Sequence, residues 1–259
     1  MANTLTPDSR RVALSLLAHP DDAEFLCVGT LIRLAEAGWE IHIATVAAGD
    51  CGSVTLSRDQ IAAVRSGEGF AAAKTIGATY HCLEEPDIQV VFDKTTNRKT
   101  IDLLRRIAPT LLFTHPRHDY MLDHEQVHLL ARGAAFSYPI PNASTLPLPS
   151  GSAIPWLYYC DPVEGRDPYT LAPIVPTTYV DISAQIDRKI EALACHTSQR
   201  EWLRSHHGMD EYIDSMKRHS TQRGAEAGVA YAEAFVQHRG HPFPQTDLLA
   251  ELLGRSGFA

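Results

Sequence analysis

Histidine beside aspartate recurs in this sequence, and imidazole together with carboxylate is the composition of many metal sites. The first such place is the run His-Pro-Asp-Asp at residues 19–22, and the chain holds 13 histidines in all. His19 and Asp22 are three residues apart, so their side chains can face the same way across a tight turn. With His124 they form a set of two imidazoles and one carboxylate. Catalytic zinc uses three protein ligands and leaves a position for water, so this set predicts a catalytic metal site.

A second aspartate, Asp21, lies inside the same run and is expected to point away from the side chain of Asp22. Beside a metal-bound water it would act as the general base. The alternative is that both aspartates only cap a following helix, as aspartates often do. Zinc is the favoured metal, although two imidazoles and one carboxylate also suit iron, manganese or nickel.

A rival motif overlaps the second half of this pattern. Residues 124–128 read His-Glu-Gln-Val-His, which matches the H-E-x-x-H motif of zinc proteases. On a helix, His124 and His128 would share a metal, with Glu125 as the base. One group of these proteases needs glycine and histidine further along the helix, where this chain holds alanine at both positions. The rival motif also leaves residues 19–22 without a role, so we treat His128 as an ordinary helix residue.

The elements expected to position these residues alternate between strands and helices. Apolar and β-branched runs predict strands, and the helical period of apolar residues predicts helices. Strands are expected at residues 12–18, 39–47, 79–84, 110–114, 156–161 and 177–182, and helices at 22–37, 57–76, 97–107, 123–138, 183 to about 205, and 222–237. This alternation implies βαβ units, and therefore an α/β, Rossmann-like fold in which helices flank a mostly parallel sheet.

Polar residues follow the first four predicted strands. These residues are His19, Asp50, Asp87 and His115. Ligands bind beyond the carboxyl ends of the strands in open parallel sheets, so we expect the four places to meet at one edge. Ser57 is placed to cap the helix expected at 57–76, and Asp123 is placed to cap the helix expected at 123–138. Residues 139–155 and 161–176 are expected to be either lids over this edge or surface loops.

The run AHPDDAEFLCVGTL resembles the signature of the LmbE-like, or PIG-L, N-deacetylases, zinc enzymes that remove acetyl groups from amino sugars. Residues 19–24 match the family's His-Pro-Asp-Asp-x-Glu throughout. Arg65 with Glu68 and the segments CLEEPD and EALACHTSQ are also similar to the family, so the resemblance covers about residues 10–200. It implies an LmbE-like fold and a single domain over residues 1–259, with a helical extension from about 205 to 259.

The resemblance also implies a role for each matching residue. The expected zinc ligands are His19, Asp22 and His124, and the expected general base is Asp21. Contacts to substrate hydroxyls, or to a neighbouring polar group, are expected from Asp50, Arg65 and Asp87. The implied reaction is hydrolysis of an N-acetyl group on an amino sugar or amino-sugar conjugate, with a zinc-bound water attacking the amide.

One residue departs from the family pattern. The family's second motif, His-x-Asp-His, stands here as Met-Leu-Asp-His, with Met121 in place of the histidine thought to act as an acid. A thioether cannot donate a proton. Either Asp21 returns the proton itself, or another group is the acid; the histidines considered are His118, His196, His206 and His207. The departure also leaves open a metal-dependent hydratase or other hydrolase on the same scaffold, or a non-catalytic sugar-binding relative.

Composition limits the expected partners. The formal charge of −8 argues against nucleic-acid binding, which needs a basic surface. No apolar run approaches the roughly 20 residues that span a bilayer, and the first residues do not resemble a secretory signal. The five scattered cysteines include no C-x-x-C and predict reduced thiols in a cytoplasmic protein. We therefore expect a small-molecule substrate, an N-acetylated sugar or conjugate, without nucleic-acid or membrane partners; a homo-oligomer is possible on family grounds.

Overall fold

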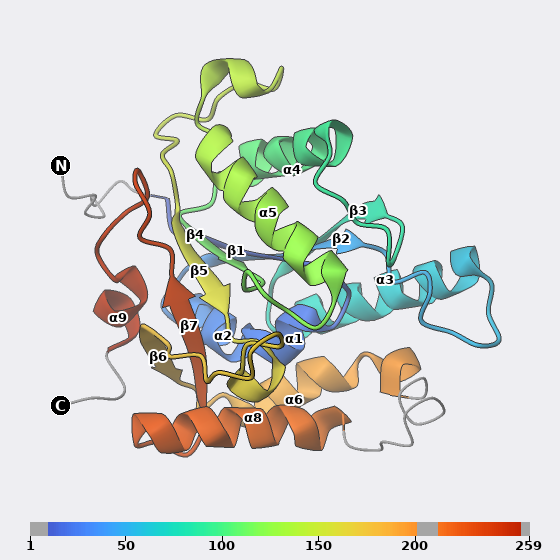
Figure 1. The fold of residues 1–259 in the computed structure, drawn as a ribbon, viewed down its shortest axis with the longest axis vertical. Helices are drawn as coiled ribbons and strands as arrows, with labels where there is room; N and C mark the ends of the chain where they lie inside the picture. Colours follow the sequence, from blue (N-terminus) through green and yellow to red (C-terminus); the bar gives the residue numbers. More distant parts are fainter. Residues whose placement is uncertain (1–9, 201–211, 255–259) are drawn as a thin grey trace.

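A seven-stranded sheet forms the centre of the computed structural model, which describes residues 10–200 and 212–254 (Figure 1). The strands lie in the order β3-β2-β1-β4-β5-β7-β6. They are β1 (Val12–Leu17), β2 (Glu40–Ala47), β3 (Thr79–Glu85), β4 (Leu111–Thr114), β5 (Trp156–Cys160), β6 (Thr178–Asp181) and β7 (Ala232–Gln237). The first five pair in parallel, and β7 is antiparallel to both of its neighbours. The expected α/β fold with a mostly parallel sheet is therefore confirmed.

Helices cover both faces of this sheet. They are α1 (Asp22–Leu26), α2 (Val28–Glu36), α3 (Arg58–Thr75), α4 (Lys94–Ile107), α5 (Leu122–Ser137), α6 (Ile186–Ala194), α8 (Tyr212–Ala227) and α9 (Leu248–Leu253), with short 3-10 turns η1 (Pro141–Ala143) and η2 (Val163–Gly165). Helices α4 and α5 lie on one face, and α1, α2, α3 and α6 lie on the other (Figure 1). No helix among the described residues combines the length and the apolar character needed to cross a membrane.

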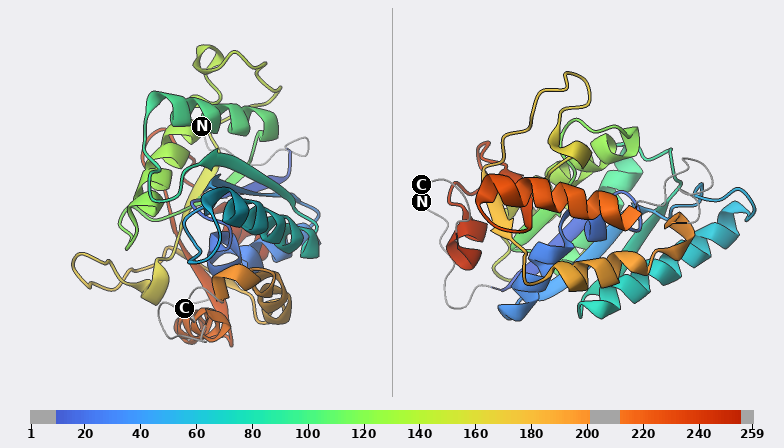
Figure 2. Two further views of the ribbon diagram at one scale, coloured as in Figure 1. Left: turned by 90° about the vertical axis from the view of Figure 1, so that its right-hand side faces the viewer. Right: turned by 90° about the horizontal axis from the view of Figure 1, so that it is seen from below.

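The central strands are apolar on both sides because each side is covered. All six residues of β1 are buried, and alternate side chains enter different cores. Leu14 and Leu16 belong to the cluster shared with α4 and α5, whereas Ala13 and Leu17 belong to the cluster shared with α1, α2 and α6. A continuous apolar run is the pattern of a parallel strand buried on both faces. On the face that carries α1 and α2, α6 and α8 lie on the outer side of these two helices (Figure 2).

Local signals set several helix ends as expected. The Ser57 side chain accepts a hydrogen bond from the backbone N–H of Gln60, and the two residues form a capping box at the start of α3. Gly38 follows α2 with φ of 80°, a conformation that favours glycine. The helix expected over 22–37 is broken at Cys27, whose φ of −143° separates α1 from α2.

Three expectations about the second half of the chain were wrong. The helix expected at 222–237 is in fact the end of α8 followed by β7, and Gly228, with φ of 73°, separates the two. Alanine and glutamate in this segment favour a helix, but β7 lies between β5 and β6, where sheet pairing and burial override local propensity. The extension expected from about 205 to 259 is therefore not wholly helical. The helix expected from 183 to about 205 is interrupted after Ala194. The single domain stays a prediction.

A buried ion pair connects β7 to helices α2 and α6. Lys189 Nζ on α6 lies 2.5 Å from Glu233 Oε1 on β7, and both side chains are almost fully buried. The same carboxylate accepts hydrogen bonds from the backbone N–H groups of Gly29 and Thr30 in the first turn of α2. Those N–H groups have no partner within the helix, and a carboxylate there is favoured by the helix dipole. Glu233 thus joins α2, α6 and the sheet.

We expect Lys189→Ala to lower the free energy of unfolding by about 3–5 kcal/mol, because it leaves the Glu233 carboxylate buried without its cation. The neighbouring pair of Arg188 and Glu36 is a matched control, since its side chains are 41% and 48% exposed. Arg188→Ala should change the free energy of unfolding by only about 0–1 kcal/mol. Urea denaturation of the two variants measures the difference. Equal losses would contradict this account of Glu233.

Candidate metal centre

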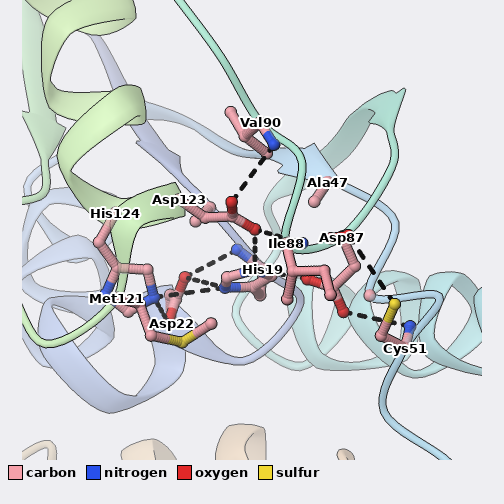
Figure 3. Close-up of polar contacts among 12 residues, drawn as sticks. His19, Asp22, Ala47, Cys51, Asp87, Ile88, Val90, Met121, Asp123 and His124 are labelled. Atoms are coloured by element: carbon pink, nitrogen blue, oxygen red, sulfur yellow. Dashed lines mark hydrogen bonds and ion pairs between the residues drawn. The ribbon is translucent and has the colours of Figure 1, made fainter.

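The expected convergence of strand ends is present at the carboxyl edge of the sheet. The loop after β1 carries His19, Asp21 and Asp22, and the loops after β2 and β3 carry Asp50 and Asp87. The segment after β4 leads into α5, which carries Asp123 and His124 in its first turn. Figure 3 shows side chains from these separate segments pointing toward one another. Four neighbouring parallel strands thus bring together residues that are up to 105 positions apart in the sequence.

The structure brings the three expected ligands together. His19 Nδ1 lies 3.3 Å from His124 Nε2, and each of these nitrogens lies 3.6 Å from one oxygen of Asp22 (Figure 3). His19 and His124 are buried, at 6% and 3% exposure. All three residues belong to a group whose potential ligand atoms lie close enough to hold one metal ion.

Both imidazoles are oriented by other carboxylates through their second nitrogens. His19 Nε2 lies 2.7 Å from Asp87 Oδ1 and 3.1 Å from Asp123 Oδ2. His124 Nδ1 lies 2.9 Å from Asp119 Oδ1. A carboxylate on the far nitrogen of a histidine fixes the ring and its tautomer, which is the usual arrangement around metal-ligating histidines. The two nitrogens that face each other are therefore the ones left for a metal.

The donor set fits zinc. Four-coordinate zinc has bonds of about 2.0–2.1 Å to nitrogen and oxygen, which places neighbouring ligand atoms about 3.4 Å apart. The separations among His19, His124 and Asp22 bracket this value. Two imidazoles and one carboxylate also leave a position for water, as catalytic zinc sites do.

The charges within this cluster shift the pKa values of its titratable side chains. Burial lowers the pKa of His19, but its hydrogen bonds to Asp123, Asp22 and Asp87 outweigh burial and hold that pKa well above its ordinary value. Burial raises the pKa of Asp22, but the nearby rings of His124 and His115 outweigh burial and hold that pKa well below its ordinary value. The cluster therefore holds carboxylates and positive charge together. A metal must displace the proton of an imidazolium before the ring can act as a ligand.

Asp21 occupies an unusual backbone conformation next to this cluster. Its φ of 114° lies in a region that residues with a Cβ rarely adopt. It precedes the first helical residue of α1, but its side chain makes no capping hydrogen bond, so the capping alternative does not apply to it. Its carboxylate instead lies 2.7 Å from the hydroxyl of Tyr212 and 3.4 Å from Arg65 Nη2. Burial raises the pKa of Asp21, although the charge of Arg65 opposes this shift.

Arg65 and Asp50 hold the loops of the site in place. The Arg65 guanidinium is buried and donates to the backbone oxygen of Pro20 at 2.7 Å. Gly49 lies against this guanidinium with φ of 72°, and a Cβ at that position would come within 2.6 Å of it. Asp50 accepts hydrogen bonds from Arg58 Nε and from the backbone N–H of Asp87, at 2.7 and 2.8 Å. The partners described for Arg65, Asp50 and Asp87 are protein groups, and substrate contacts from them stay a prediction.

His128 lies apart from the other imidazoles. Its Nδ1 donates to the backbone oxygen of His115, and its ring contacts Tyr159 at 4.6 Å between centroids. Within the described part of the chain, no group of potential metal ligands includes His128. The ring stacked on His124 is that of His115, at 3.9 Å and an interplanar angle of 10°. The H-E-x-x-H interpretation is therefore not supported.

The two described histidines that were considered as acids, His118 and His196, differ in burial and in hydrogen-bond or ion-pair partner. His118 is half exposed, and its Nδ1 lies 2.7 Å from Asp167 in the segment 161–176. His196 is buried, with its Nε2 3.4 Å from a carboxylate oxygen of Glu24. His206 and His207 lie outside the described residues. The structure gives neither His118 nor His196 a contact with the ligand residues.

The segment 161–176 reaches across to the start of α5. The Tyr169 hydroxyl donates to Glu125 at 3.0 Å, and the same carboxylate oxygen accepts from the backbone N–H of Asp119. The other end of the segment is held by Asp161, whose carboxylate accepts hydrogen bonds from Nε and Nη2 of Arg223 on α8. Residues 161–176 therefore connect α8 to the loop beside the metal centre.

Two residues of the site were not predicted in their observed roles. Asp123 was expected to cap α5, but Met121 holds the capping position. The Asp123 carboxylate instead accepts hydrogen bonds from the backbone N–H groups of Ile88 and Val90 and contacts His19. Asp119, on the far nitrogen of His124, was not singled out. The signal available for both was the Asp-rich sequence around the second motif.

Comparisons with known proteins find similarity to a deacetylase family and to individual enzymes. The family described as GlcNAc-PI de-N-acetylase (PIG-L) matches residues 14–135. The 4-oxalmesaconate hydratase of Pseudomonas putida is 24% identical, covering 92% of this chain and 90% of the relative. The 1D-myo-inositol 2-acetamido-2-deoxy-alpha-D-glucopyranoside deacetylase of Rhodococcus jostii is 26% identical, covering 74% and 82%.

Among solved structures, N,N′-diacetylchitobiose deacetylase from Pyrococcus horikoshii superposes with a TM-score of 0.74 at 23% identity, covering 92% of this chain and 88% of that one. This similarity shows a shared fold. The family match over residues 14–135, the relatives and the cluster of His19, Asp22 and His124 agree: the chain is similar to the PIG-L, or LmbE-like, deacetylases and to a hydratase. Deacetylase and hydratase names both occur among the proteins it is similar to.

We expect His124→Ala to abolish stoichiometric zinc binding, because it removes one of three ligands. His128→Ala is the matched control, since it alters a buried imidazole one turn further along the same helix, and it should keep its zinc. Asp119→Asn should weaken zinc affinity about 10- to 100-fold, because the ring of His124 loses its orienting carboxylate. Metal analysis after dialysis, and competition with a chromogenic chelator, measure these effects. Loss of zinc in the His128 variant alone would overturn the ligand assignment.

Proposed function

We propose that this protein is a zinc-dependent hydrolase that removes the N-acetyl group from an amino sugar or amino-sugar conjugate, with Asp21 as the general base. The observation that carries the proposal is the arrangement of Asp21 beside a three-ligand set. His19 and His124 present their free nitrogens 3.3 Å apart, and Asp22, the residue after Asp21, completes the set. A base next to a metal-bound water is what hydrolysis of an unactivated amide requires.

The ligands of the proposed metal are His19, Asp22 and His124. When bound there, zinc lowers the pKa of a coordinated water toward about 7 and polarises a carbonyl oxygen. The carboxylates of Asp87, Asp123 and Asp119 orient the two imidazoles through the ring nitrogens that face away from the metal position. The burial of the cluster excludes bulk water and strengthens each of these electrostatic contacts.

Asp21 carries the proton through the reaction. Its carboxylate accepts a proton from the attacking water, and the water oxygen forms a bond to the acetamide carbon. The tetrahedral intermediate collapses when the carbon–nitrogen bond breaks, and the leaving nitrogen takes the proton from Asp21 to give an amine and acetic acid, which ionises to acetate on release. Met121 cannot serve as the acid, His118 pairs with Asp167, and His196 Nε2 lies 3.4 Å from Glu24. His206 and His207, the other histidines considered, lie outside the described residues. In this proposal the same carboxyl group acts first as base and then as acid.

A second candidate function is hydration of an unsaturated acid. Two observations favour it: Met121 replaces the acid histidine expected of the deacetylases, and a hydratase aligns over 92% of this chain. In hydration, Asp21 would again take a proton from water while the oxygen adds to one carbon of the double bond. The proton would then pass to the other carbon, and no leaving group would form. Both reactions use Asp21 and the same ligands.

The test is a panel assay on the zinc-loaded protein. N,N′-diacetylchitobiose and N-acetylglucosamine report deacetylation through release of a primary amine, and 4-oxalmesaconate reports hydration through loss of its conjugated absorbance. We expect amine release that a chelator abolishes and added zinc restores. Turnover of the unsaturated acid alone would replace the deacetylase proposal with the hydratase. No turnover of either class by zinc-loaded protein would contradict both.

We expect Asp21→Ala to lower the rate about 10²- to 10⁴-fold while leaving one zinc bound per chain, because it removes the base but no ligand. Asp59→Asn, on the exposed first turn of α3, is the control and should keep wild-type rates. Steady-state rates and metal analysis on the same samples separate the two effects. Loss of zinc in the Asp21 variant would make this residue a ligand and would refute its role as base.

A further inference from the structure

The general base has a hydrogen-bond partner far away in the sequence. The hydroxyl of Tyr212, at the start of α8, donates to Asp21 Oδ2 at 2.7 Å across 191 residues. The family match ends at residue 135, so this contact comes from a part of the chain that the match does not include. We propose that Tyr212 is a positioning residue: its hydroxyl holds the Asp21 carboxylate in the orientation that water activation needs. The proposal rests on the proposed role of Asp21.

Asp21 needs an outside partner because its own backbone is held in an unfavourable conformation. At φ of 114°, a residue with a Cβ is strained, and such strain persists only where the surroundings hold it. Among the described residues, the other hydrogen-bond donor to this carboxylate is Arg65, whose Nη2 lies 3.4 Å from Oδ1. That same nitrogen makes a shorter hydrogen bond, of 2.7 Å, to the backbone oxygen of Pro20. Tyr212 therefore makes the shorter of these two hydrogen bonds to Asp21 from the described part of the chain.

Tyr212 is itself held firmly enough to orient another side chain. Its ring packs against Phe25 of α1 with centroids 6.3 Å apart. Along α8, Met216 is fully buried, and Arg223 makes two hydrogen bonds of 2.6 and 2.8 Å to Asp161. Burial and the charge of Asp21 raise the pKa of the Tyr212 hydroxyl well above its ordinary value, so the phenol stays protonated and remains a donor.

The hydrogen bond also assigns different tasks to the two oxygens of the base. The Tyr212 hydroxyl occupies Oδ2, and Oδ1, with its longer contact to Arg65, retains the capacity to accept a proton from water. Without the hydroxyl, the carboxylate can rotate about its Cβ–Cγ bond. A misplacement of a catalytic group by about 1 Å costs about 10²-fold in rate. Because rotation misplaces the base only part of the time, we expect a loss of about tenfold to a hundredfold.

The kinetic test is Tyr212→Phe, which removes one hydroxyl and keeps the ring. With whichever of N,N′-diacetylchitobiose or 4-oxalmesaconate the enzyme turns over, kcat should fall about 10- to 100-fold, while KM and zinc content stay within about twofold. Tyr179→Phe is the matched control, because it removes a tyrosine hydroxyl that donates to a carboxylate elsewhere on α8, that of Glu226 at 2.8 Å. The control should keep wild-type kcat. A wild-type kcat for Tyr212→Phe would overturn the proposal.

A second measurement does not depend on turnover. In protein labelled with ¹³C at tyrosine Cζ, the Tyr212 resonance is identified by its absence from Tyr212→Phe. Asp21→Asn replaces the charged acceptor by a neutral one and should shift that resonance, while the Tyr179 resonance stays in place. An unmoved Tyr212 resonance would overturn the contact with Asp21. If no substrate is turned over and the resonance moves, the proposed function fails while the pairing of Tyr212 with Asp21 stands.

Discussion

Burying several carboxylates at one sheet edge requires positive charge beside them, and the architecture around the site meets this requirement. Asp22, Asp87, Asp119 and Asp123 all contact the imidazole of His19 or His124. Unpaired burial of even one carboxylate is strongly unfavourable, and like charges in a low-dielectric setting repel. The imidazoles and the Arg65 guanidinium supply the balancing charge, and backbone N–H groups complete the hydrogen bonds. The same balance makes the centre receptive to a divalent cation, which can take the place of the protons.

Local patterns in the sequence were enough to predict the parallel half of the fold. The apolar run of β1, the Ser57 capping box and Gly38 each act within a few residues, so sequence spacing reveals them. The clustering of His19, Asp22 and His124 could also be predicted, because parallel strands place consecutive strand ends at one edge. The role of β7 could not, since its alanine and glutamate favour a helix and only its pairing with β5 and β6 makes it a strand.

Roles that depend on distant partners were missed for a related reason. Asp123 begins a helix, and nothing local distinguishes a capping aspartate from one that binds the loop after β3 and the ring of His19. Tyr212 meets Asp21 only because α8 packs beneath α1, an arrangement set by α6 and β7. Residue type and spacing identify chemical capacity, whereas the choice among possible partners is made by tertiary packing.

The position of β7 has a consequence for how the chain is made. β7 is the last of the seven strands in the sequence, so it is the last to leave the ribosome. In the sheet, however, β7 lies between β5 and β6, which are both made before it. Until residue 237 emerges, β5 has an unpaired edge, and β6 has no neighbour to join. Unpaired edges invite pairing with other chains. Nascent chains that stall in this interval are therefore the ones most exposed to misassembly during synthesis.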